Sequence, residues 1–126
     1  MRVLIDTHVL LWGLQDPPRL SDRVRALLPK SDVWISVASL WEIIAKVQVG
    51  KLKLPTPVRD FLTLKLRENG VLILPLTFDH VRRLEELPLH HRDPFDRILI
   101  AQSLEENLPL ITADSLFKNY AVRLIW

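Results

Sequence analysis

The chain contains no cysteine among its 126 residues, so disulfide bonds and thiolate-bound metals are excluded. This absence fits a reducing cytosol, and we expect a cytoplasmic protein. Glycine is also scarce, because only Gly13, Gly50 and Gly70 occur and each stands alone. Without a glycine-rich phosphate loop, nucleotide binding of the P-loop or Rossmann type is not expected.

Long apolar segments are missing as well. The longest apolar runs, 71–76 and 98–101, are far too short to cross a bilayer, so we expect no membrane association. Asp6 and His8 interrupt the apolar residues near the N-terminus, and this pattern does not indicate a signal peptide. The net charge is only +2, which permits a polyanionic partner without indicating one.

The remaining composition is typical of a globular protein. Hydrophobic residues make up 48% of the chain and charged residues 25%, so intrinsic disorder is not the interpretation. A chain of 126 residues can bury a proper core without covalent crosslinks. We expect residues 1–126 to form a single domain.

Short apolar runs alternate with segments of helical period. The apolar runs are rich in branched residues and predict five strands, at 2–5, 33–36, 71–74, 109–112 and 122–125. The segments between them predict helices at 21–28, 37–49, 57–69, 78–87, 94–107 and 115–120. Capping residues or a proline in the first turn support several helix starts, at Ser21, Thr56-Pro57, Thr77 and Asp93-Pro94, and Gly70 is a candidate C-cap.

Strands that alternate with helices imply right-handed crossovers and a mostly parallel sheet. The predicted strands are apolar throughout, as parallel strands buried on both faces are. We therefore predict a three-layer α/β/α domain with a central, mostly parallel five-stranded sheet. Ligands of such folds bind beyond the carboxyl ends of the strands.

Four acidic residues adjoin these predicted strand ends. Asp6 directly follows the strand at 2–5, and Glu42 lies in the second turn of the helix that follows 33–36. Asp114 comes two residues after 109–112, and Asp96 lies in the first turn of the helix that leads into that strand. We expect the four carboxylates to converge on one rim of the sheet.

Each of these acids also has a purely structural interpretation. Asp6 before Thr7-His8-Val9 and Asp114 before Ser115-Leu116-Phe117 can each be an N-cap. Glu42 completes the capping-box pattern S-x-x-E, in which a glutamate only binds a backbone N–H. Asp93 precedes a proline and suits an N-cap, and Asp96 is then a second acid favoured by the helix dipole. Taken singly, both interpretations stay open for every acid.

Taken together, the acids favour a metal site. Two carboxylates about 4 Å apart repel by roughly 4 kcal/mol at an effective dielectric constant of 20. A cluster of four persists only if protons or cations neutralise it. Donors that are all oxygen suit Mg²⁺ or Mn²⁺ rather than zinc.

Basic and aromatic side chains point less clearly to a function. The basic residues near the predicted rim either contact a nucleic-acid backbone or form a solvated face: Lys46, Lys51, Lys53, Arg92 and Arg97. Lys46 also suits an ion pair with Glu42 four residues earlier. The histidines show no metal-ligand spacing, and His90 and His91 are predicted to lie in a solvated loop or to contact phosphate. The tryptophans are interpreted as core or dimer-interface residues: Trp12, Trp34, Trp41 and Trp126.

Four segments in this order resemble the PIN-domain family, and most closely the VapC-type ribonuclease toxins of prokaryotic toxin–antitoxin systems. They are LIDTHVLLW at 4–12, SVASLWEIIAKVQVGKLKLP at 36–55, HHRDPFDRILIAQS at 90–103 and LPLITAD at 108–114. The resemblance implies a site of three or four acids that binds one or two Mg²⁺ or Mn²⁺ ions. Asp6 matches the acid after the first strand, Glu42 the acid of S-x-x-E, Asp96 the acid of D-x-x-x-x-A, and Asp114 the acid of T-A-D.

The resemblance also implies roles for three neighbouring residues. Asp93 falls in the D-P-F-D form that a subgroup shows, and we expect it to be a cap or to lie behind the ligands. Thr7 and Thr112 match small hydroxyl positions beside the acids, where they would order water or phosphate.

The function that the resemblance implies is that of a metal-dependent endoribonuclease toxin, neutralised by a cognate protein antitoxin. Its substrate would be a structured RNA such as tRNA or rRNA, its products would carry a 5′-phosphate and a 3′-hydroxyl, and the protein would form a homodimer. A non-catalytic PIN module that binds RNA or protein is the alternative. A receiver-type signalling domain is disfavoured, because Pro75 follows the third predicted strand where that class needs an aspartate.

Overall fold

The computed structural model describes residues 1–90 and 92–126, which form alternating strands and helices. The strands are β1 Arg2–Ile5, β2 Asp32–Ser36, β3 Leu72–Leu74, β4 Leu110–Ile111 and β5 Leu124–Ile125. The helices are α1 Thr7–Gln15, α2 Asp22–Leu27, α3 Val37–Gln48, α4 Val58–Glu68, α5 Phe78–Arg83 and α6 Pro94–Glu106. Short 3₁₀ helices occupy Pro17–Arg19, Leu28–Lys30, Leu84–Glu86 and Ser115–Asn119.

The five strands form one sheet in the order β3-β2-β1-β4-β5, and every pairing between these strands is parallel. Ile5 at the end of β1 lies opposite Ile35 of β2 and Ile111 of β4. The carboxyl ends of the three central strands therefore meet at one edge. The predicted α/β fold with a parallel five-stranded sheet is confirmed.

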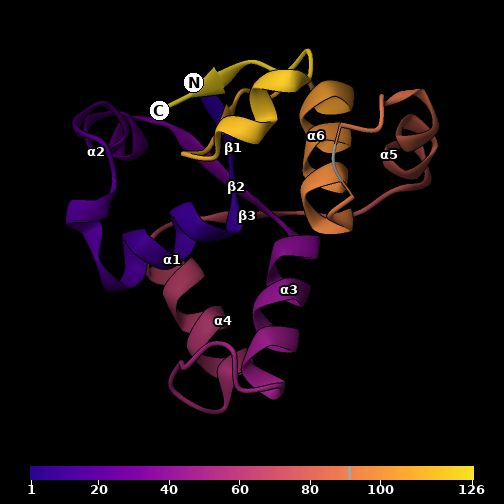
Figure 1. The fold of residues 1–126 in the computed structure, drawn as a ribbon. Helices are drawn as coiled ribbons and strands as arrows, with labels where there is room; N and C mark the ends of the chain where they lie inside the picture. The colour runs from indigo at the N-terminus through magenta and orange to yellow at the C-terminus, as the bar shows by residue number, and fades with distance from the viewer. Residues whose placement is uncertain (91) are drawn as a thin grey trace.

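Helices cover both faces of the sheet, because successive residues of a strand point to opposite sides. In β1, Val3 and Ile5 belong to the core beneath α1, α2 and α4, whereas Leu4 belongs to the core beneath α6. Figure 1 shows α1, α2 and α4 on one side of the strands and α6 on the other, with α5 outside α6. The result is three layers with two apolar cores.

Helix α1 was not predicted from the sequence. Its segment, THVLLWGLQ, is apolar on nearly every side: Val9 and Leu10 are fully buried, and Leu11, Trp12 and Leu14 pack partly against the same core. A helix with apolar residues all round lacks the polar face that reveals a period of 3.6 residues. This missed helix carries part of the candidate site.

Two predicted helix boundaries were also wrong. Helix α4 begins at Val58, so Pro57 is its N-cap rather than its first residue, and no side chain caps it. The segment predicted as a helix over 78–87 is α5 followed by a 3₁₀ turn at Leu84–Glu86. By contrast, Ser21, Thr77 and Asp93 cap their helices as predicted. Gly70 follows α4 at a positive φ of 64°, a conformation that glycine adopts without strain.

Within the part of the chain that the structure describes, no helix is both long and apolar enough to cross a membrane.

Candidate active site

The carboxyl edge of the sheet gathers residues from distant parts of the chain. Asp6 follows β1, α3 begins directly after β2, and Thr112 follows β4. Because β2, β1 and β4 are neighbours in the sheet, the residues after them share one rim.

A cavity of about 200 Å³ opens at this rim, and we call it the acid cavity. Its lining includes all four acids predicted from the sequence. The full lining is Asp6, Thr7, His8, Glu42, Lys46, Asp93, Asp96, Asp114 and Phe117. The folded chain thus brings five carboxylates around one small space with one lysine.

Asp6 is the most confined of these acids. It is 6% exposed, and its Oδ1 accepts a hydrogen bond of 2.8 Å from the backbone N–H of Val9, so it caps α1. The hydroxyl of Thr112 donates to Oδ2 of Asp6 and accepts a 3.1 Å hydrogen bond from the backbone N–H of Asp114. Burial raises the pKa of Asp6 above its usual range, although the hydrogen bonds from Thr112 and Val9 oppose this. The side chain of Asp6 therefore both caps α1 and lines the acid cavity.

Glu42 does not form the capping box that its sequence pattern permits. Helix α3 begins earlier, at Val37, and Ser36 caps it by accepting a 3.0 Å hydrogen bond from the N–H of Ala38. Glu42 is 7% exposed and lies inside the helix, where the hydroxyl of Thr7 donates to Oε1 at 2.7 Å. The ammonium of Lys46 donates to Oε2 at 2.8 Å, so the predicted ion pair with Lys46 is confirmed.

Asp93 and Asp96 lie at the start of α6. Asp93 is the N-cap, and its Oδ1 accepts from the N–H groups of Phe95 at 2.9 Å and of Asp96 at 3.3 Å. Burial raises the pKa of Asp96 to about 7, and the neighbouring carboxylates of Asp93 and Asp114 add to the effect. The carboxyl of Asp96 is therefore held among other negative groups.

Asp114 caps the 3₁₀ helix Ser115–Asn119, with its Oδ1 accepting from the N–H of Leu116 at 2.9 Å. It remains exposed at the mouth of the cavity. Asp114 and Glu42 also help to raise the pKa of Asp96 through their charge. The four acids thus interact electrostatically, although they come from four different elements.

The donor set fits a hard divalent cation, because every carboxylate of the cavity offers oxygen ligands and their mutual repulsion favours a positive charge. Within residues 1–90 and 92–126, no three histidine, aspartate or glutamate side chains are already close enough to hold an ion. Glu42 is instead bound by Thr7 and Lys46.

Several other predicted residues lie elsewhere. Arg97 donates to the carbonyl oxygens of Pro88 at 2.9 Å and Leu84 at 3.3 Å, so it ties the loop before α6 to the helix. Lys53 and Arg92 are exposed and do not line the acid cavity. His90 packs edge-on against Tyr120, and His91 lies outside the described residues.

His8 is a lining residue that sequence reasoning missed. It lies in the first turn of α1, two residues after Asp6, and is exposed at the cavity. Its position becomes evident only once α1 is known to be a helix, because the first turn of that helix then lies at the rim of the sheet.

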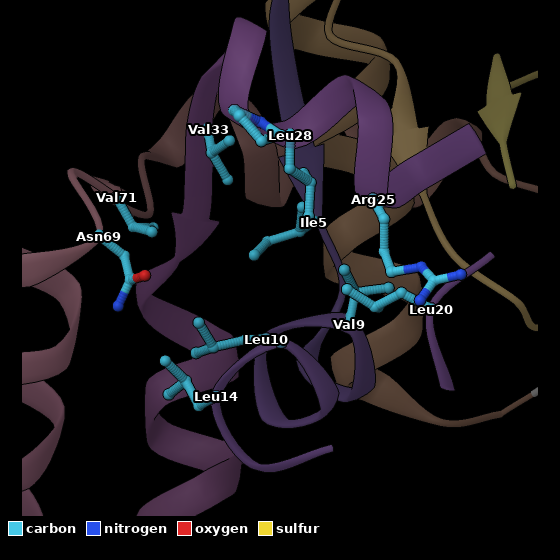
Figure 2. Close-up of a pocket in the computed structure, with 12 residues that line it drawn as sticks. Ile5, Val9, Leu10, Leu14, Leu20, Arg25, Leu28, Val33, Asn69 and Val71 are labelled. Atoms are coloured by element: carbon cyan, nitrogen blue, oxygen red, sulfur yellow. The ribbon is translucent and has the colours of Figure 1, made fainter. Parts of the chain in front are cut away.

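A second hollow has no chemistry of this kind. Figure 2 shows Ile5, Leu10, Leu14 and Val33 around an apolar cavity of about 340 Å³, which lies along one face of α1. Its polar lining side chains are Arg25 and Asn69, and it has no carboxylate. The acid cavity is therefore the candidate active site despite its smaller size.

Comparison with known protein families identifies the family of the chain. The PIN domain family matches residues 3–123, which is nearly the whole chain. The chain belongs to the PIN domain family. A search of curated protein sequences finds no match to this PIN domain.

Solved structures with a similar fold include DNA-bound VapBC from Salmonella typhimurium, with a TM-score of 0.75, 13% identity, and coverage of 99% of this chain and 97% of that one. FitAcB from Neisseria gonorrhoeae has a TM-score of 0.72 and 21% identity over 100% and 97% of the two chains. A toxin–antitoxin complex from Klebsiella pneumoniae has a TM-score of 0.65 and 17% identity over 98% and 96%. At these identities, the similarity establishes a shared fold.

Proposed function

We propose that this PIN domain, taken as one domain over residues 1–126, is a Mg²⁺- or Mn²⁺-dependent endoribonuclease that hydrolyses RNA phosphodiester bonds. The observation that carries the proposal is the acid cavity, where five carboxylates from four elements line about 200 Å³ at the carboxyl edge of the sheet. Ligands of parallel α/β folds bind at this edge. Burial and, to a smaller extent, repulsion by the neighbouring acids raise the pKa of Asp96 to about 7, and this repulsion favours a bound cation.

Asp6, Glu42, Asp96 and Asp114 are the residues that we assign to metal binding and catalysis. Thr112 orients the carboxylate of Asp6, and Thr7 orients that of Glu42, because each hydroxyl donates to one carboxylate oxygen. Hydrogen bonds of this kind behind a ligand set its direction and its basicity. Asp93 caps α6 and adds negative charge beside Asp96.

A bound Mg²⁺ or Mn²⁺ ion would supply an activated water and would neutralise charge on the phosphoryl group. The chain itself holds Asp6, Asp96 and Asp114 at the starts of helical segments and Glu42 inside α3. Lys46 offers a cation beside Glu42, where a substrate phosphate would approach. If water attacks the phosphorus and the bond to the 3′-oxygen breaks, the products carry a 5′-phosphate and a 3′-hydroxyl.

The proposal includes the biological role of a cytoplasmic toxin that a protein antitoxin neutralises. The similar structures support it, since they comprise VapBC, FitAcB and a complex described as toxin–antitoxin. A structured RNA such as tRNA or rRNA is the proposed target. We also propose a homodimer, because Leu72 and Ile73 on the edge strand β3 are 45% and 48% exposed and residues 71–76 contain no charge.

The direct test is cleavage of a structured RNA by the purified protein with Mn²⁺, with Mg²⁺ and with excess EDTA. Cleavage should require the divalent ion. Asp6→Asn and Asp96→Asn should each lower the rate at least a hundredfold while circular dichroism shows an unchanged fold. Cleavage in EDTA, or full activity in both variants, contradicts the proposal.

The alternative function is a non-catalytic PIN module that binds RNA or protein. It is favoured by the finding that, among the described residues, no group of three side chains is ready to hold a metal ion. This alternative predicts RNA binding without cleavage at any Mn²⁺ concentration. Mass spectrometry of the RNA after incubation separates the two functions.

A further inference from the structure

Another cavity, distinct from the apolar one in Figure 2, adjoins the acid cavity along helix α1. It has a volume of about 290 Å³ and shares three lining residues with the acid cavity, Thr7, His8 and Lys46. We call it the α1 groove. If an RNA chain binds with one phosphate at the acids, its next nucleotide lies beside this groove. The groove has about the volume of a small-molecule pocket.

Flat side chains form one part of the α1 groove. The rings of His8 and Trp12 lie 5.8 Å apart, and the guanidinium of Arg19 stacks over Trp12 at 4.5 Å from the ring centre. His8 and Arg19 are exposed, whereas Trp12 is half-buried beneath them. Exposed imidazole and guanidinium planes on a fixed indole suit the stacking of an unpaired base.

Positive charge forms the other part. Lys46 and Lys51 line the groove together with Arg19, and Asp16 is the acid that lines it. Lys51 is exposed, and its backbone N–H donates to the carbonyl of Lys46 at 2.9 Å, which holds it just beyond the end of α3. Within the described residues, Lys51 has no carboxylate within ion-pair distance. Its ammonium is therefore available to a phosphate.

We propose that the α1 groove binds the nucleotide next to the scissile phosphate of single-stranded RNA. The base stacks on His8 and Arg19, and the adjoining phosphate contacts Lys51. This inference rests on the proposed ribonuclease function, because it assumes that the acid cavity takes RNA. It adds residues that contact substrate without touching the reacting atoms.

An acidic segment of a protein partner would meet the same positive charges. The adjoining planar groups of His8, Trp12 and Arg19 favour RNA, since a base gains from stacking on a planar group whereas a carboxylate gains only from charge. Binding of the same variants to an acidic peptide, poly-glutamate, therefore separates the two ligands.

The test measures binding of a fluorescent single-stranded RNA of about 12 nucleotides, in EDTA so that no cleavage occurs. Three variants are compared with the unaltered protein: Lys51→Ala, His8→Ala and, as the matched control, Lys53→Ala. Lys53 is an exposed lysine two residues after Lys51 that does not line either cavity. Thermal denaturation checks that each variant is folded.

Lys51→Ala should weaken binding about fivefold and should lower the slope of log K against log salt concentration by about 0.7, the value for one lost phosphate contact on a single strand. His8→Ala should weaken binding about fivefold with an unchanged slope, because stacking releases no counterions. Lys53→Ala should bind as the unaltered protein does.

Equal binding by the Lys51 and Lys53 variants overturns the inference. So does an effect of Lys51→Ala that appears only in binding of poly-glutamate, since the groove then takes an acidic protein segment. If these RNA results hold but the unaltered protein does not cleave RNA with Mn²⁺, the ribonuclease proposal fails and the RNA groove stands.

Discussion

Replacing Asp96 by asparagine should make the metal-free protein more stable while abolishing its activity. The carboxyl of Asp96 lies partly buried among Asp93, Asp114, Glu42 and Asp6, and its pKa is raised from 3.8 to about 7. Between these two pH values the folded protein holds a proton that the unfolded chain releases. The free energy of unfolding therefore falls as pH rises through this window, and the loss is complete above about pH 7.

The size of this loss follows from the pKa. A rise from 3.8 to about 7 corresponds to about 4 kcal/mol. Solvent screening at this partly exposed carboxyl reduces the figure to about 1–2 kcal/mol. Asparagine has a similar shape and no charge, so Asp96→Asn should recover this amount at pH 8. For a domain of this size, the melting temperature should rise by about 4–8 °C.

The assay is thermal denaturation in EDTA at several pH values, with Asp32→Asn as the control. Asp32 is an exposed carboxylate at the amino end of β2, away from the acid cavity. The advantage of Asp96→Asn should be near zero at pH 4 and largest at pH 8. An advantage that is absent, or equal at both pH values, would refute the electrostatic argument.

Added metal should reverse the order of stability. Mn²⁺ at a hundred times its Kd stabilises a folded protein by about 2.7 kcal/mol. The unaltered protein should gain this in full, whereas Asp96→Asn should gain less because it lacks one ligand. An equal shift of both proteins would show that Asp96 does not contact the ion.

Three further predictions concern the supports of the site and the fold. Thr112→Val removes the hydroxyl that donates to Asp6, so metal affinity measured by calorimetry should fall about tenfold or more, whereas Thr112→Ser should retain it. Asp93→Ala removes the cap of α6 and should lower the free energy of unfolding in urea by about 1 kcal/mol, whereas Asp93→Asn, which can still cap, should cost little. Gly13→Ala should stabilise α1 by about 0.5–1 kcal/mol, because the added methyl group meets only a Leu20 carbon at 4.0 Å, whereas Gly70→Ala should destabilise by a similar amount because Gly70 has a φ of 64°. Equal effects within any of these pairs would contradict the assigned role.

The layered fold could be read from the sequence because its strands are short apolar runs with helices between them. The five predicted strands all occur, and each begins and ends within two residues of its predicted position. Helix α1 could not be read in the same way. Its apolar residues point to nearly all sides and leave no amphipathic period, so only packing against the sheet reveals it.

The acids themselves were also evident from the sequence, but their local interpretations were not decisive. A carboxylate near a helix start can be either a cap or a ligand, and Asp6, Asp93 and Asp114 all cap helical turns while lining the acid cavity. Glu42 shows the opposite case. Its capping-box pattern is present in the sequence, yet α3 begins at Val37 with Ser36 as its cap, and the carboxylate of Glu42 is bound by Thr7 and Lys46.

The sequence by itself determined which apolar runs form strands, which residues cap the helices and which acids offer oxygen ligands, since these features depend on neighbouring residues. Tertiary structure alone decided which side chains meet. Thr7 reaches Glu42 across 35 positions of sequence, and Thr112 reaches Asp6 across 106. Such contacts depend on parallel pairing of β1 with β2 and β4, because only that pairing brings the carboxyl ends of the three strands to one edge.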